Sequence, residues 1–220
     1  MNTCVIFCAG GFDRMIEPVD ETDLVIAADG GLNYVNQLGL TPDIILGDFD
    51  SLGYVPEGAN VYPVEKDDTD AMLAIRQGLE RGFCRFVLYG CLDGPRLDHT
   101  VAALQSLQFL ADRGAIGYLM GLQYIAAAVQ NGSLRFPADA AGILSLFCMG
   151  EDAKGVTLEN LQYTLSNATL TSHFPLGVSN HFIGKEAAVT VTEGSLLALY
   201  DRTCGLPTQH TIRQQGGTAS

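Results

Sequence analysis

Two aspartates separated by one residue form the first candidate site for chemistry. Residues 44–46 form a short apolar run typical of a buried strand, and Gly47 then leads into Asp48-Phe49-Asp50. Because side chains alternate along an extended chain, Asp48 and Asp50 are predicted to point the same way. Two carboxylates this close repel each other unless a cation lies between them. The spacing indicates a hard divalent cation such as Mg²⁺, bound together with substrate phosphates, or alternatively a hydrated acidic turn.

Further acidic residues occur where strands are expected to end or helices to begin. Asp29 precedes two glycines, so its loop could bring backbone N–H groups close to a phosphate, although a plain Asp-Gly turn explains the pair equally well. Asp67, Asp68 and Asp70 precede an amphipathic stretch, where helix capping accounts for one or two acids but hardly for three.

One cation and one more acid complete the set in the first half of the chain. Asp98 could cap a helix, and taken singly that interpretation is favoured, with the neighbouring His99 a surface residue. Arg96 adds a guanidinium able to meet phosphate oxygens in bidentate fashion. The combination favours a carboxylate-rich, metal-dependent site suited to phosphoryl chemistry.

Alternating strands and helices must position these residues. Apolar runs predict buried strands at residues 3–8, 24–28, 44–46, 60–64, 85–89 and 115–120. Helical patterns occupy residues 32–38, the stretch from Met72 to Gly82, and residues 98–113, the last with Val101, Leu104 and Leu107 facing inward. This alternation predicts an α/β domain with a mostly parallel sheet flanked by helices, with ligands at the carboxyl ends of its strands.

The pattern changes near Gly121. Short strand-like runs follow, separated by turn signals such as Asn131-Gly132, and no convincing amphipathic helix appears. The runs cover residues 124–129, 133–136, 143–148, 156–157, 187–192 and 196–200. We therefore expect an α/β domain at 1–125, an all-β sandwich at 126–220, and a frayed tail from residue 211.

Composition limits the partners and the compartment. With 12 basic and 25 acidic residues the formal net charge is −13, so nucleic acid and membrane surfaces are unfavourable partners. The six cysteines show no Cys-x-x-Cys pair and no zinc spacing, which favours reduced thiols and a cytoplasmic location. The N-terminal apolar run lacks the features of a signal peptide and is expected to be the first strand.

Several well-known sequence motifs are missing. The chain has no Gly-x-x-x-x-Gly-Lys-[Ser/Thr], no Gly-x-Gly-x-x-Gly after a strand, no Gly-x-Ser-x-Gly and no His-Glu-x-x-His. Walker-type nucleotide sites, serine nucleophiles and zinc proteolysis are thereby disfavoured.

Five motifs occur in order over nearly the whole chain. They are Ala28-Asp29-Gly30-Gly31-Leu32-Asn33, then Pro42-Asp43 running into Leu46-Gly47-Asp48-Phe49-Asp50-Ser51, then Asp67-Asp68-Thr69-Asp70, then Gly90 through Arg96-Leu97-Asp98-His99, and Gly177-Val178-Ser179-Asn180-His181-Phe182. Together they resemble the thiamine pyrophosphokinase family. The resemblance implies a homodimer that uses ATP with Mg²⁺ to convert thiamine into thiamine diphosphate and AMP. The α/β domain would bind ATP and Mg²⁺, and the sandwich would bind thiamine.

The resemblance also implies roles for individual residues. The catalytic residues would be Asp48, Asp50, Asp70 and Asp98, and the first three would hold Mg²⁺. The ATP side would comprise Asp29, Gly30, Gly31, Asn33, Gly47 and Arg96. Thiamine would contact Asp98 and, from the other subunit, Ser179, Asn180 and Phe182.

The sequence departs from the family pattern in two places. It has no tryptophan, whereas some relatives stack one on thiamine near the position of His181 and Phe182. The loop from Gly90 to Arg96 carries Asp93 and Pro95, where the family often has glycine and small residues.

Two other enzyme classes and one non-enzymatic role remain open at this point. A pyrophosphokinase for another small alcohol, such as a hydroxymethylpterin, could use the same catalytic domain. A haloacid-dehalogenase-type phosphatase also places Asp-x-Asp after a strand, but it needs a lysine, and Lys66, Lys154 and Lys185 are poorly placed. A nucleotide sensor with a degenerate site is disfavoured because every required acid is present.

Overall fold

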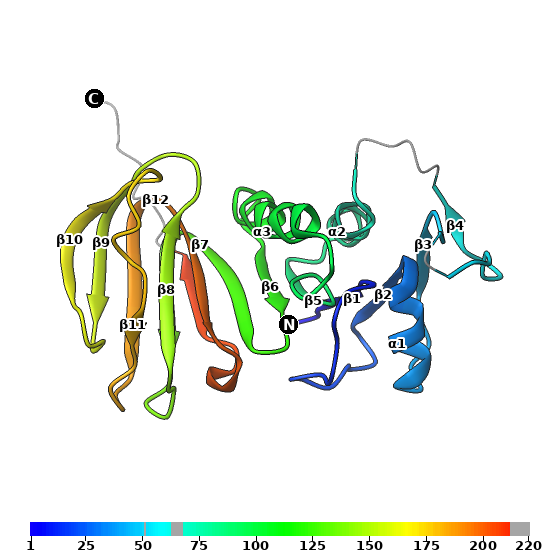
Figure 1. Ribbon diagram of the computed structural model, residues 1–220, viewed down its shortest axis with the longest axis horizontal. Helices are drawn as coiled ribbons and strands as arrows, with labels where there is room; N and C mark the ends of the chain where they lie inside the picture. The colour runs from blue at the N-terminus through cyan, green and yellow to red at the C-terminus, as the bar shows by residue number, and fades with distance from the viewer. Residues whose placement is uncertain (51, 63–67, 212–220) are drawn as a thin grey trace. The chain divides into compact units, whose positions relative to one another are not determined.

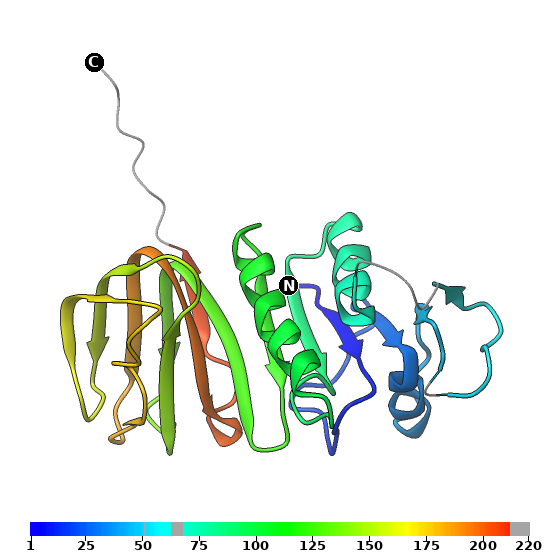
Figure 2. The same ribbon diagram turned by 45° about the horizontal axis from the view of Figure 1, so that its top comes forward.

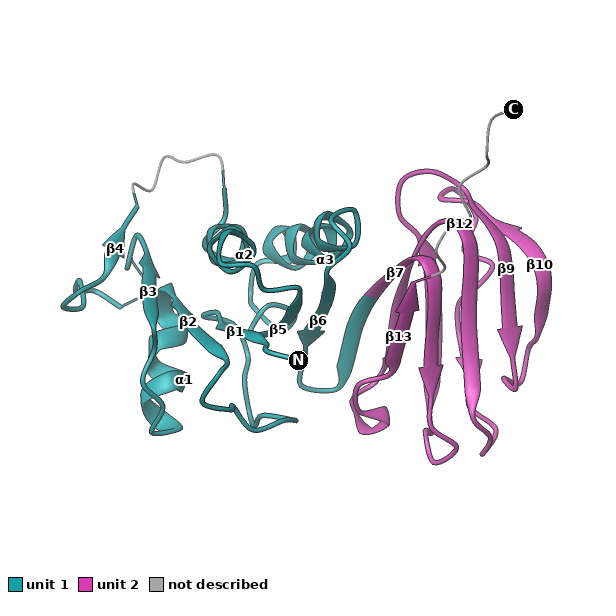
Figure 3. Cartoon of the chain, turned by 180° about the vertical axis from the view of Figure 1, so that it is seen from behind, with its two compact units in different colours: residues 1–127 teal, residues 128–220 magenta. Residues whose placement is uncertain are grey.

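The computed structural model describes residues 1–50, 52–62 and 68–211. It forms two compact units, Met1–Ala127 and Ala128–Ser220, shown in different colours in Figure 3. Asp67 of the acidic motif and the expected C-terminal tail beyond residue 211 lie outside the described residues.

Unit 1 contains a mostly parallel sheet in the order β4-β3-β2-β1-β5-β6-β7 (Figure 1). Each pair from β4 to β6 is parallel, and only the start of β7 pairs antiparallel with β6. The strands are β1 (Cys4–Phe7), β2 (Leu24–Ala28), β3 (Ile44–Gly47), β4 (Asn60–Val61), β5 (Arg85–Tyr89), β6 (Ile116–Met120) and β7 (Tyr124–Phe136). The chain builds outward from β1 to β4 and then returns to the other side of β1 with β5. The strand order therefore reverses between β1 and β5.

The helices cover both faces of this sheet (Figures 1 and 2). A short 3-10 turn η1 (Asp29–Gly31) leads into α1 (Leu32–Gln37) on one face, and α2 (Asp70–Glu80) and α3 (Leu97–Ala111) lie on the other. Right-handed crossovers that run in opposite directions along a sheet place their helices on opposite faces, so the reversal at β1 explains this arrangement. None of the helices among the described residues is long and apolar enough to cross a membrane.

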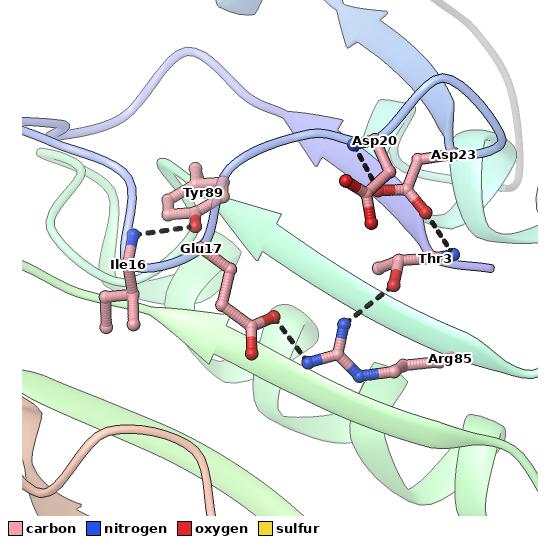
Figure 4. Close-up of polar contacts among 7 residues, drawn as sticks. All are labelled: Thr3, Ile16, Glu17, Asp20, Asp23, Arg85 and Tyr89. Carbon is pink, nitrogen blue, oxygen red and sulfur yellow. Dashed lines mark hydrogen bonds and ion pairs between the residues drawn. The ribbon is translucent and has the colours of Figure 1, made fainter. Parts of the chain in front are cut away.

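One face of the sheet is covered by the long connection between β1 and β2, tied down by polar contacts (Figure 4). The Arg85 guanidinium donates to Glu17 at 2.5 Å and to the Thr3 hydroxyl at 2.7 Å. The backbone N–H of Ile16 donates to the Tyr89 hydroxyl at 3.1 Å. These contacts fix a segment that has no regular secondary structure of its own.

Unit 2 is an all-β sandwich in which one long strand joins the layers. Its strands are the end of β7, β8 (Ile143–Cys148), β9 (Ala153–Glu159), β10 (Leu165–Leu170), β11 (Asn180–His181), β12 (Ala187–Asp201) and β13 (Thr208–Thr211). The first part of β12 pairs with β9, and its second part pairs with β8. Phe136 packs against Phe182 and Tyr200 in the core, with ring centroids 5.1 and 5.0 Å apart.

The predicted turn at Asn131-Gly132 is wrong, because β7 continues through it. Asn131 adopts φ 44, and its side-chain oxygen accepts a hydrogen bond from the N–H of Gly194 at 3.0 Å. Gly194, at φ 94, similarly lies inside β12, where the sequence predicted two separate strands. Asn131 and Gly194 therefore mark local irregularities within long strands. The strands continue through them because neighbouring strands form hydrogen bonds with the backbone on either side.

Two expectations for α3 also fail. Val101 was expected to face inward but is exposed, and the buried positions of α3 are Ala103, Ser106, Leu107, Leu110 and Ala111. Asp98 is not the N-cap, since α3 begins at Leu97 after Arg96.

Gly31 gives a test of how tightly η1 and α1 pack against β1. A Cβ added at this position would lie 2.0 Å from the Phe7 carbonyl oxygen, a backbone atom that cannot rotate away. We expect Gly31→Ala to lower the free energy of unfolding by about 1–3 kcal/mol, the usual range for overpacking.

The matched control for this prediction is Gly94→Ala. A Cβ at Gly94 meets nothing closer than 3.9 Å, so its stability should stay near that of the wild type. Urea denaturation of both variants checks the prediction, and equal stabilities would contradict it.

Candidate active site

A cavity of about 660 Å³ in unit 1 brings most of the predicted acids together. Its wall includes residues that follow β1 and β5, where the strand order reverses, which is the position where open α/β sheets bind ligands. The lining residues that carry side-chain chemistry are Cys8, Asp29, Asp48, Asp50, Asp68, Thr69, Asp70, Cys91, Arg96, His99 and Thr100.

The tightest acidic group consists of Asp29, Asp48 and Asp50. One carboxylate oxygen from each lies within 4.8 Å of the other two. Asp29 is buried, Asp48 is half-buried and Asp50 is exposed, so the group extends from the sheet towards solvent. The sequence placed Asp29 with the nucleotide and Asp70 with the metal. In the structure it is Asp29 that joins the two aspartates after β3.

A turn, not an extended strand, brings Asp48 and Asp50 together. Phe49 adopts φ 61 and is buried, and the N–H of Asp50 donates to the Asp48 carboxylate at 3.2 Å. The prediction that both carboxylates share one site was right, but its reason, strand alternation, was wrong. A left-handed conformation costs a residue such as Phe49 about 1–2 kcal/mol, whereas Asp29, at φ 49, belongs to a residue type that adopts it more readily. Such strain concentrates at functional sites.

Gly47 allows Asp29 and the β3 turn to approach. It adopts φ 145, and a Cβ there would lie 3.1–3.2 Å from the backbone N, Cα and Cβ of Asp29. Gly47, Gly30, Gly31 and Asn33 do not themselves line the cavity. Gly47 and Gly31 shape the backbone beneath the site, while Asn33 is exposed on α1.

Asp70 lines the same cavity but does not cap its helix. The Thr69 side chain caps α2 by accepting a hydrogen bond from the N–H of Met72 at 3.2 Å. Asp68 forms an ion pair with Arg76 at 2.8 Å. Thr69 is therefore the cap of α2, and Asp70 follows it in the first turn, where the helix N-terminus favours negative charge.

Arg96 and Asp98 pair with each other at the exposed rim. The guanidinium donates to both carboxylate oxygens, at 3.2 and 2.6 Å. The hydrogen bond from Arg96 lowers the pKa of Asp98, and the same bond raises the pKa of Arg96, with a smaller contribution from the charge of Asp50. Arg96 lines the cavity, whereas Asp98 does not.

The predicted thiamine residues Ser179, Asn180 and Phe182 lie in unit 2. Asn180 is buried, where its side chain accepts from the N–H of Tyr163 and donates to the Tyr163 carbonyl, at 3.0 and 2.7 Å. Phe182 is buried against Phe136. Ser179, at φ 60, is exposed. Of the three, Ser179 is the side chain available to a ligand, and Asn180 holds the turn that presents it.

Sequence reasoning missed the cavity thiols and misjudged one neighbour of Asp98. Cys8 and Cys91 lie 3.4 Å apart, sulfur to sulfur, and the hydrogen bond between them, together with burial, raises the pKa of Cys8 well above its usual range. A protonated thiol is a poor nucleophile, so we give Cys8 no part in the reaction of the site. His99, considered a surface residue, lines the cavity although it is exposed. Cys8 and Cys91 are 83 positions apart, and no local sequence pattern indicates that they lie next to each other.

Comparison with known proteins agrees with this arrangement. Residues 17–116 match the family model for the thiamin pyrophosphokinase catalytic domain, and residues 133–196 match that for the vitamin B1 binding domain. The thiamine pyrophosphokinase of Bacillus subtilis is 26% identical over 211 residues, which cover 87% of this chain and 95% of the relative.

Solved structures show the same fold. The crystal structure of the Bacillus subtilis thiamine pyrophosphokinase has a TM-score of 0.77 at 25% identity, covering 91% of this chain and 99% of the other. A thiamin pyrophosphokinase family protein from Enterococcus faecalis has a TM-score of 0.73 at 25% identity, covering 91% of this chain and 99% of the other. The thiamin pyrophosphokinase of Candida albicans has a TM-score of 0.68 at 14% identity, covering 91% of this chain and 88% of the other. At that identity the comparison shows a shared fold alone.

These matches do not favour the pterin and phosphatase alternatives. Two family models match successive parts of the chain, and one relative aligns over nearly its full length. Together with the acidic cavity of unit 1, these matches show that the chain belongs to the thiamine pyrophosphokinase family of ATP-dependent diphosphotransferases.

Proposed function

We propose that unit 1 binds ATP with Mg²⁺ at the Asp29, Asp48 and Asp50 cluster and transfers its terminal diphosphate to the hydroxyl of thiamine, releasing AMP. The observation that carries this proposal is the convergence of three carboxylates within 4.8 Å in a cavity large enough for a small ligand.

The donor set fits Mg²⁺. This ion takes oxygen ligands at about 2.0–2.1 Å in octahedral geometry, so ligands on opposite sides lie roughly 4.2 Å apart. Carboxylate oxygens within 4.8 Å of one another need only a small adjustment to reach that span. When bound, the ion would neutralise charge on the transferred diphosphate, adding to the positive charge of Arg96 in a protein of net charge −13.

The residues of the chain would bind and orient the substrates. Asp29, Asp48 and Asp50 would hold the metal from three sides, with Asp70 facing the same cavity from the start of α2. Arg96 would exchange its exposed partner Asp98 for a phosphate oxygen, since ion pairs at the surface are weak. Asp98, once released, would be free to face the cationic thiamine.

Unit 2 would supply the thiamine contact as part of a homodimer. Unit 2 exposes several large apolar side chains, most of them within five residues of Ser179 in the sequence, which is unusual for a surface that stays in water. They are Tyr163, Phe174, Leu176, Val178 and Ile183. A second copy of the chain would cover them, and Tyr163 and Phe174 are exposed aromatic rings in a chain without tryptophan. The free cysteines of unit 2 and unit 1 fit a reducing, cytoplasmic location.

The proposed activity is tested by measuring AMP formation from ATP and Mg²⁺ with thiamine, with a hydroxymethylpterin, or with no acceptor. Thiamine-dependent AMP release together with thiamine diphosphate supports the proposal. Acceptor-independent release of phosphate, or a preference for the pterin, would overturn it.

Removing one carboxylate from the cluster should abolish turnover. We expect Asp48→Asn and Asp50→Asn each to lower kcat by about 10²-fold or more, because a preorganised electrostatic contact is lost. Both variants should remain folded by circular dichroism. Asp139→Asn, at an exposed position in unit 2, is the charge-matched control. Near-normal turnover of either cluster variant at saturating Mg²⁺ would disprove the assignment.

Substitution of Asp70 distinguishes a structural role of its carboxylate from a chemical one. Because Thr69 caps α2, Asp70→Ser should leave the melting temperature close to that of the wild type while lowering kcat. Thr69→Ala, by contrast, removes the cap and should cost about 1 kcal/mol of stability. Thermal melts and steady-state kinetics check both variants. Full activity of Asp70→Ser would contradict a chemical role for the Asp70 carboxylate and limit it to a structural one at the start of α2.

Complementation between two inactive variants tests whether the site is shared between subunits. Asp48→Asn removes a metal ligand, and Ser179→Arg places a bulky positive charge where the thiamine cation would bind. If each site combines unit 1 of one chain with unit 2 of the other, random mixed dimers contain one intact site, and activity should recover to roughly a quarter of wild type.

Mass spectrometry of differently labelled chains serves as the control for subunit exchange. Verified exchange without recovery would show that each site is built within one chain. Ser179 is preferred over Asn180 because Asn180 is buried and holds Tyr163.

A further inference from the structure

Two thiols meet at the point where the strand order of unit 1 reverses. Cys8 directly follows β1, and Cys91 follows β5 after one glycine. Because β1 and β5 are parallel neighbours, paired from Cys4↔Phe86 to Phe7↔Tyr89, residues 83 positions apart become adjacent. The two sulfurs lie 3.4 Å apart.

Fixed backbone holds this pair in place. The N–H of Cys8 donates to the Tyr89 carbonyl, and the N–H of Gly10 donates to the Gly90 carbonyl, both at 2.9 Å. Gly90 adopts φ 73, and a Cβ there would lie 2.4 Å from the Cys8 carbonyl oxygen, so only glycine permits this approach. A disulfide has an S–S length of about 2.05 Å, so the two sulfurs must move roughly 1.4 Å closer to form one.

The pair also lies in the wall of the acidic cavity. Cys8, Cys91 and the backbone of Gly10 and Gly90 line it together with the Asp29 cluster. Cys91 is buried, at 8% exposure, whereas Cys8 is partly exposed. Of the two residues, Cys8 is the more exposed to solvent.

We propose that Cys8 and Cys91 form a reversible disulfide in the wall of the ATP cavity, and that a low-molecular-weight disulfide thereby switches the enzyme off. The bond itself follows from the geometry of the thiols alone, while the loss of activity rests on the proposed function of the cavity.

The chemistry is two successive thiol–disulfide exchanges. The small fraction of Cys8 that has lost its proton attacks one sulfur of the small disulfide, forming a mixed disulfide and releasing the first small thiol. This step is slow, because the hydrogen bond to Cys91 and burial keep most of the Cys8 thiol protonated. The Cys91 sulfur then attacks the Cys8 sulfur and releases the second small thiol. Two protein thiols are oxidised by two electrons, the small disulfide is reduced, and the two protons end on the released thiols.

The switch acts through the position of the cavity wall. Drawing the sulfurs together pulls on the turn that contains Gly10 and on the turn that contains Gly90, which are joined by a hydrogen bond. A misplacement of about 1 Å in a positioned site can cost on the order of 10²-fold in rate. In a reducing compartment the bond would form only transiently, as is usual for redox-sensing disulfides.

The test exposes the full-length protein to buffers of reduced and oxidised glutathione at graded ratios. Intact mass and peptide mapping report the bond, and thiamine-dependent AMP formation reports activity. We expect a Cys8–Cys91 cross-link with the loss of two hydrogen atoms, an activity loss of at least about tenfold, and full recovery with dithiothreitol.

Three variants serve as controls, each compared with its own activity in the reduced state. Cys84→Ser, which removes an exposed cysteine, should respond like the wild type. Cys8→Ser and Cys91→Ser should form no cross-link and should be insensitive to the oxidised buffer once any glutathione adduct at Cys84 is accounted for by mass.

Each outcome decides a different part of the proposal. Glutathione on Cys84 without any Cys8–Cys91 cross-link would overturn the disulfide. A cross-link with unchanged activity would overturn the switch. A reduced enzyme that makes no AMP with thiamine would refute the proposed function, while the cross-link would still be measurable by mass.

Discussion

Mutual repulsion among the carboxylates of Asp29, Asp48 and Asp50 is the constraint on which the rest of unit 1 depends. Their oxygens lie within 4.8 Å of one another in a protein of net charge −13. Backbone strain at Phe49 adds to that cost. Such an arrangement requires rigidity in the backbone beneath it, and the Mg²⁺ ion proposed above would lower its energy when bound. The packing of Gly31 on β1 and of Gly47 on Asp29 supplies that rigidity.

The same electrostatics account for how an acidic protein can handle an anionic substrate. Free ATP would be repelled by the cluster, whereas ATP accompanied by Mg²⁺ would bring the positive charge that the cavity lacks. Thiamine is a cation, so the negative field favours it at the same time. Arg96 is the cationic side chain among the residues that line the cavity, and its exposed pairing with Asp98 leaves it available for exchange.

In unit 2, buried side chains hold the backbone of a turn whose neighbouring residue, Ser179, is exposed. Asn180 uses its carboxamide on the backbone of Tyr163, and Phe182 packs in the core against Phe136. Their burial fixes the turn at Ser179, while Tyr163 and Phe174 of the same unit are exposed. Of the residues that the family resemblance indicates in this unit, Asn180 and Phe182 are thus buried and Ser179 is exposed.

The sequence by itself determined the class of each element in unit 1, the acids at strand ends and, through five ordered motifs, the family. These signals are local, since apolar periodicity and turn residues report on the chain within a few positions. Tertiary structure alone decided that Asp29 joins Asp48 and Asp50 and that Cys8 meets Cys91. It also decided that β7 and β12 run through their turn signals, because hydrogen bonds from neighbouring strands override local preference. Each of these outcomes depends on which strands lie side by side, and strand order is a property of the folded sheet that no local stretch of sequence encodes.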